Sequence, residues 1–210
     1  MSRHHLRFTL AALVNLGIGV SIGCTSVPVH YYTLASPPEK ARTASEIPFA
    51  IDVRVNHIPP QLNRAELMIR TGPTQVTLLE NERWASPVND EIKEALRLEL
   101  QRRLDRTTGW RVAFTKLTLD IDVQQLEAEF GRYAILEVSW SADLSATGQQ
   151  SNGTAPTFCT FRADEKIQAG YAELVEGYQR EMAALADAIV AVLTSPASGI
   201  DASCRKSIAG

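Results

Sequence analysis

Apolar residues along this chain recur with two different periods, and each period predicts one kind of element. In segments such as 117–123 every second residue is apolar, which is typical of a strand with one buried face. Short runs of aromatic and β-branched residues indicate further strands. The predicted strands cover residues 31–34, 49–55, 67–70, 75–79, 110–114, 117–130, 134–146 and 157–162.

Two longer segments show the spacing of three and four residues that gathers apolar side chains on one side of a helix. The first helix is expected to begin at Ser86-Pro87, where serine can cap and proline needs no N–H partner, and to end before Gly109. The second runs from about Gly170 to Leu193. We therefore predict an α+β fold, with a mainly antiparallel sheet and both amphipathic helices packed on one face.

The N-terminal segment has the features of a secretory signal. Arg3 and Arg7 precede a mostly apolar run over 8–20, and about 13 residues are too few to span a bilayer as a helix. The following Ile22-Gly23-Cys24 resembles a bacterial lipobox. Cleavage there would make Cys24 an acylated N-terminus and anchor the protein to a membrane. The alternative is an ordinary cleaved signal with Cys24 near the cut.

This interpretation divides the chain into four parts. We expect a lipoprotein-type signal peptide at 1–23, then a lipidated tether with a first short strand and loop at 24–48. An α+β domain follows at 49–195, with a C-terminal tail at 196–210. In the lipoproteins that this segment resembles, the absence of Asp after the cysteine favours sorting to the outer membrane, and here that position is Thr25.

The charge of the chain argues against a nucleic-acid partner. The formal net charge is −3, and removal of Arg3 and Arg7 with the signal would make it −5. A nucleic-acid-binding surface needs clustered basic residues, which a mildly acidic domain of this kind does not favour.

Three cysteines are present, and acylation of Cys24 would leave the pair Cys159 and Cys204. In an oxidising compartment such a pair favours a disulfide, which would tie the C-terminal tail to a strand. The alternative is two unpaired thiols, with Cys159 acting as a small apolar residue of the strand.

Residues that could support catalysis or metal binding do not form a recognisable pattern. His30 and His57 each lack a second ligand at metal-site spacing. Asp120 and Asp122 share one face of a strand, and their alternation with apolar residues indicates a solvated face rather than an acid–base pair. Cys159 has no neighbouring base that would activate it as a nucleophile. We therefore expect no enzyme, no metal and no cofactor.

Four segments together resemble a known family. They are the early strand Tyr31-Tyr32-Thr33-Leu34, the segment 58–64 with Ile-Pro at its start, the stretch Trp84-Ala85-Ser86-Pro87, and the turn at 130–133. In this combination the chain is similar to the PqiC-like, or ABC-type transport auxiliary, lipoproteins over nearly all of its mature length. The tail after Leu193, which contains Cys204, is not part of the resemblance.

The resemblance implies a non-enzymatic accessory subunit of an MCE-type intermembrane lipid transport system, held at the periplasmic face of the outer membrane. It implies an MCE-domain protein as the partner and self-assembly into a homo-oligomeric ring. A general envelope-assembly lipoprotein, such as a pilotin or chaperone for another outer-membrane complex, is the alternative. Trp84 is either a core residue or an exposed contact for the partner, because tryptophan is common in both places.

Overall fold

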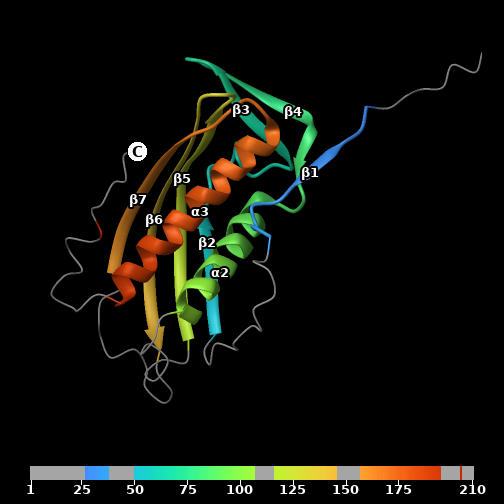
Figure 1. The fold of residues 1–210 in the computed structure, drawn as a ribbon. Helices are drawn as coiled ribbons and strands as arrows, with labels where there is room; N and C mark the ends of the chain where they lie inside the picture. The colour runs from blue at the N-terminus through green and yellow to red at the C-terminus, as the bar shows by residue number, and fades with distance from the viewer. Residues whose placement is uncertain (1–26, 38–49, 107–115, 146–156, 195–203, 205–210) are drawn as a thin grey trace, which may run out of the picture.

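A mixed seven-stranded sheet covered on one face by two helices makes up the fold (Figure 1). The computed structural model describes residues 27–37, 50–106, 116–145, 157–194 and 204. The sheet order is β1-β4-β3-β5-β6-β7, and β2 pairs with β5 outside this path. The strands are β1 (His30–Tyr32), β2 (Ala50–His57), β3 (Glu66–Gly72), β4 (Gln75–Trp84), β5 (Lys116–Glu129), β6 (Tyr133–Ser145) and β7 (Thr157–Lys166).

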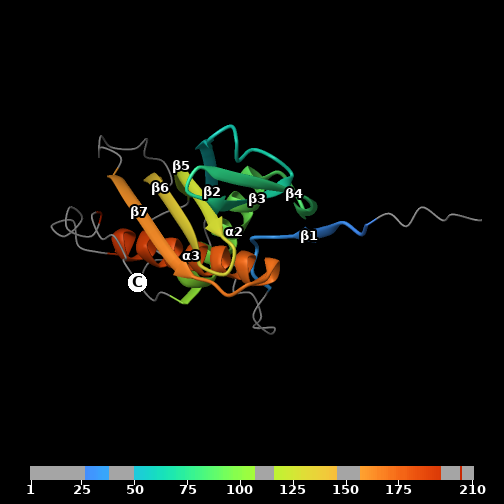
Figure 2. The same cartoon turned by 90° about the horizontal axis from the view of Figure 1, so that it is seen from above.

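The two predicted helices are confirmed with closely matching bounds. They are α2 (Val88–Arg106) and α3 (Tyr171–Thr194), which lie side by side against the same face of the sheet in both views (Figures 1 and 2). The apolar stripe predicted for α2 is at most 1% exposed at every position. Arg103 of α2 also forms an ion pair with Asp187 of α3, its Nε lying 2.5 Å from Oδ1.

Helix α3 packs closely against Ala134 of β6 and against Ile167, which follows β7, at Gly177. A Cβ atom at this position would lie 2.6 Å from Cγ2 of Ile167 and 3.4 Å from Cβ of Ala134. Only glycine therefore allows this helix turn to pack directly on the sheet, because any side chain would force the two layers apart. The core fills the space between the helices and the sheet with residues from every described element except β1.

The predicted α+β class with a mainly antiparallel sheet is confirmed, but the sheet is mixed and not purely antiparallel. The predicted hairpin at 65–80 is present as the antiparallel pair β3 and β4, and β5, β6 and β7 form an antiparallel meander. Strand β1 runs parallel to β4, and β2 and β3 both run parallel to β5. Alternation along one strand predicts which residues are buried, whereas the neighbouring strand depends on how the connections cross the fold.

The order of the strands places β1 and β7 at opposite ends of the sheet. Figure 2 shows β1 extending away from the body of the domain on the side opposite β7. In the described part of the chain, no helix has the length and apolar character needed to cross a membrane. The expected strand at 110–114, the signal peptide at 1–23 and all of the tail except Cys204 lie outside the described residues.

Candidate functional site

The predicted lipidation site, Cys24, lies outside the described residues, which begin three positions later at Val27. The candidate functional site is formed by the first described segment and the elements it contacts. Residues 30–34 lie against the ends of β4 and α2, and two carboxylates hold them there. We call this arrangement the N-terminal clamp and define it by residues 30–34 with Glu82 and Glu91.

Glu82 of β4 binds two side chains of β1. The Tyr32 hydroxyl donates to Oε2 at 2.6 Å, and Nδ1 of His30 lies 3.0 Å from Oε1. Burial would raise the pKa of Glu82, but these two hydrogen bonds outweigh it and lower the pKa below its ordinary value. Burial and the bond to Glu82 raise the pKa of Tyr32 to about 12. Tyr32 therefore stays a neutral donor to an ionised carboxylate, which makes a strong hydrogen bond.

Glu91, in the first turn of α2, accepts four hydrogen bonds: two from the segment after β1 and two from Ser86, just before the helix. Thr33 Oγ1 and the Leu34 amide donate to Oε2 at 2.7 and 2.9 Å. The hydroxyl and the amide of Ser86 donate to Oε1 at 2.8 and 3.0 Å. The sequence predicted Ser86 as a helix cap, and in the structure its hydroxyl and amide both donate to Glu91 of the first helical turn.

Sequence reasoning missed the burial of Glu91. The residue is only 5% exposed. An acidic residue in the first turn of a helix is common, so its type gave no warning. The signal that identifies it is tertiary, because two of its donors come from residues 33 and 34, far away in the sequence.

An open groove lies beside the clamp, between β1 with its following residues and α3. Its volume is about 590 Å³. Tyr31, Tyr32 and Pro37 line one wall, and Val175 and Arg180 contribute to the other. Gln179 of α3 donates to the Thr33 carbonyl at 3.0 Å, which links the two walls. The surface beside the clamp is thus hollowed and partly apolar.

Trp84, the other predicted contact residue, lies in the core. It is 6% exposed, and its ring centroid is 6.3 Å from that of Tyr178 in α3. The core alternative therefore describes Trp84 in this structure, since a partner could reach the indole only after the helix moved.

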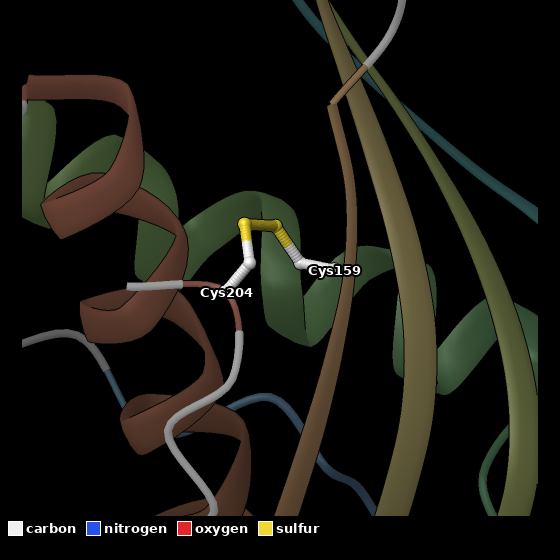
Figure 3. The surroundings of a disulfide bond; sticks show 2 residues. All are labelled: Cys159 and Cys204. Atoms are coloured by element: carbon white, nitrogen blue, oxygen red, sulfur yellow. A yellow bond between two sulfur atoms is a disulfide. The ribbon is translucent and has the colours of Figure 1, made fainter. Parts of the chain in front are cut away.

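Cys159 and Cys204 are brought together in a disulfide, with 4.7 Å between their Cα atoms (Figure 3). Cys159 is on β7, so the bond fixes a residue of the C-terminal tail to the edge strand opposite β1. A bonded sulfur also has no thiol for nucleophilic chemistry.

Helix α3 contains a second acidic residue that sequence reasoning missed. Glu181 is completely buried, and neither carboxyl oxygen has a hydrogen-bond partner among the described residues. Burial, reinforced by Glu165 and Asp164, raises the pKa of Glu181 to about 9, and a backbone group of Leu136 opposes this only in part. Position 181 follows Tyr178 by three residues on the apolar stripe, which is the signal that could have revealed it.

Of the residues considered for catalysis or metal binding, His57 of β2 and Asp122 of β5 are register partners on neighbouring strands. Asp120 accepts a hydrogen bond from the Asn56 amide at 3.0 Å, and Asp122 is exposed. The described residues include no group of three or more histidine, cysteine or acidic side chains that could hold a metal ion. His30 is engaged by Glu82 in the clamp, which the sequence did not predict.

Comparison with solved structures shows the fold in one other protein and a weaker likeness to a second. A protein described as uncharacterized aligns with a TM-score of 0.59 and 18% identity, covering 80% of this chain and 100% of its own. Protein XCC0632 from Xanthomonas campestris, of family DUF330, aligns with a TM-score of 0.48 and 13% identity over 77% of this chain and 92% of its own. No curated protein matches the chain significantly.

The sequence profile of the family described as ABC-type transport auxiliary lipoprotein component matches residues 32–190. This range contains most of the clamp, all of α2, most of α3 and six of the seven strands in full. The resemblance found in the sequence is therefore confirmed, and the chain belongs to the ABC-type transport auxiliary lipoprotein family.

Proposed function

We propose that this protein is a non-enzymatic accessory subunit of an ABC-type system that moves lipid between membranes, anchored by an acylated Cys24 at the periplasmic face of the outer membrane. The observation that carries the proposal is the position of the family match, which begins at Tyr32, eight residues after the lipobox cysteine. The family match and the lipobox are found by separate features of the sequence. A lipobox that directly precedes the family domain supports a lipid-anchored domain.

The clamp supports the same proposal. Attachment of residues 30–34 to the folded body shortens the free chain between the predicted anchor and the domain. Glu82 and Glu91 bind residues 30–34 at a point just after the predicted acylation site, and together they accept hydrogen bonds from His30, Tyr32, Thr33 and Leu34. Several charge-assisted hydrogen bonds hold this segment on the domain, as expected if the segment fixes the domain's position relative to the anchor.

The partner in this proposal is an MCE-domain protein of the same transport system, and the subunit assembles into a homo-oligomeric ring around it. The test is to express the full-length protein with its own signal, isolate it from membranes, and measure its intact mass. The mass expected is that of residues 24–210 plus fatty acyl chains, in the outer-membrane fraction.

A Cys24→Ser variant is the matched control and should leave that fraction. Mild crosslinking followed by affinity isolation should recover an MCE-domain protein with the acylated form. An unmodified Cys24 thiol, or repeated recovery of secretin or pilus components in place of an MCE-domain protein, would contradict the proposal.

A further inference from the structure

The segment before and within β1 has two chemically different faces. His30 and Tyr32 face the domain and bind Glu82. The residues that alternate with them are exposed and apolar in character: Val27 is 67% exposed, Val29 42% and Tyr31 65%. Val27, Val29 and Tyr31 are thus three exposed apolar or aromatic side chains within five residues, and Tyr31 also lines the open groove beside α3. Exposed apolar side chains that lie this close together mark a candidate contact surface.

The length of chain between these side chains and the predicted anchor limits what can cover them. Three residues separate Cys24 from Val27, and an extended chain spans at most about 3.6 Å per residue, so Val27 lies within roughly 11 Å of Cys24. The headgroup region on each side of a bilayer is about 5–8 Å thick. A Cys24 whose acyl chains are buried therefore holds Val27 at the membrane surface.

Tyr31 has more freedom, because seven residues allow it to lie up to roughly 25 Å from Cys24. Its position therefore distinguishes a segment that lies along the membrane from one that points away from it. Valine side chains gain free energy when they leave water, and tyrosine prefers the headgroup region, where its ring is covered and its hydroxyl is hydrated.

We propose that Val27, Val29 and Tyr31 lie in the headgroup region of the phospholipid layer that holds the Cys24 lipid, so that β1 runs along the membrane and the β1 edge of the sheet faces it. The inference rests on the proposed function, because it needs an acylated Cys24. Strand β7 is then the edge directed away from the membrane.

The test uses full-length acylated protein, isolated from membranes in detergent and returned to phosphatidylcholine vesicles whose acyl chains carry bromine near the headgroup. Bromine quenches tryptophan fluorescence only at short range. The probe is Tyr31→Trp, and the matched control is Phe158→Trp, an aromatic residue of β7 that is 77% exposed at the opposite edge. The native protein supplies the background of its three tryptophans.

We expect brominated vesicles to reduce the fluorescence of Tyr31→Trp beyond that of the native protein, and to leave Phe158→Trp at the native level. No additional loss for Tyr31→Trp, or equal loss for both variants, overturns the inference. The intact mass of each preparation separates the two failures: an acylated protein without selective quenching refutes the membrane contact of these side chains alone. An unacylated Cys24 refutes the proposed function and this inference with it.

Discussion

The buried carboxyl of Glu181 makes the stability of the domain depend on pH. Its pKa is about 9 in the folded protein and 4.5 ordinarily, so between these values the folded protein binds a proton that the unfolded chain releases. Linkage then lowers the free energy of unfolding as pH rises, by about 1.4 kcal/mol per pH unit for this group. Glu181→Gln removes this contribution and should become progressively more stable than the native protein from about pH 5 to about pH 8.

Urea unfolding followed by far-ultraviolet circular dichroism at several pH values measures this difference. Glu176→Gln is the matched control, because Glu176 is exposed on the same helix. Other titrating groups cancel when two variants are compared at each pH. Parallel curves for Glu181→Gln and the native protein would show that the carboxyl is not proton-bound in the folded state.

A second prediction concerns the two adjacent tyrosines of β1. Tyr32→Phe removes a hydroxyl that donates to Glu82 at 2.6 Å, and should lower the free energy of unfolding by about 1–2 kcal/mol. Tyr31→Phe should change it by less than about 0.5 kcal/mol, because Tyr31 is mostly exposed. Hydrogen exchange should become faster at residues 30–34 in Tyr32→Phe alone. Equal effects of the two changes would contradict the role given to Glu82.

At the scale of single elements, the start of α2 depends on Glu91. Glu91→Ala deprives the Leu34 amide, Thr33 and Ser86 of their acceptor, so we expect a loss on the order of 3 kcal/mol in the free energy of unfolding. Glu94→Ala, three residues later, removes only an exposed ion pair with Arg97 and should cost less than about 0.5 kcal/mol. Urea unfolding of both variants makes the comparison, and similar losses would refute the capping role.

The elements that the sequence predicted well are those with a long, regular period. Leu96 and Leu100 lie at the centre of the apolar stripe of α2. The spacing of this stripe alone identifies the buried side of the helix, without information from the rest of the chain. The carboxylates of the site escaped prediction for the opposite reason. Glu91 is buried because β1 brings donors to it, and Glu181 is buried because α3 packs closely at Gly177. Neither cause is local.

At the scale of the whole molecule, the disulfide joins the tail to β7 across 45 residues of sequence. Cys204→Ser should lower the free energy of unfolding by about 2–4 kcal/mol, because the unfolded chain regains the freedom of an open loop. Urea unfolding of native and variant protein measures this.

Alkylation without reductant, read by mass spectrometry, checks the bond itself. Labelling should appear at Cys159 and Cys204 only after reduction. Two labelled thiols in the unreduced acylated protein would show that the cysteines are unpaired.

The order of the strands could not be predicted at this scale. Alternation in 49–55 identified β2 but not its parallel neighbour, β5, whose partner residues begin at Lys116. A parallel neighbour is reached through a crossover, so it is rarely the next strand in sequence. The hydrophobic periodicity predicted the general α+β class, and the clamp emerged only when β1 was placed beside β4.

The parallel pairing of β1 with β4 has a mechanical consequence. A force that drags the domain parallel to the membrane would act along β1, because this strand extends outward from the body along its own axis (Figure 1). Such a load shears the backbone ladder and the bonds to Glu82 and Glu91 together instead of breaking them one after another. We therefore expect the attachment to resist tension far better than the shortness of a three-residue strand suggests.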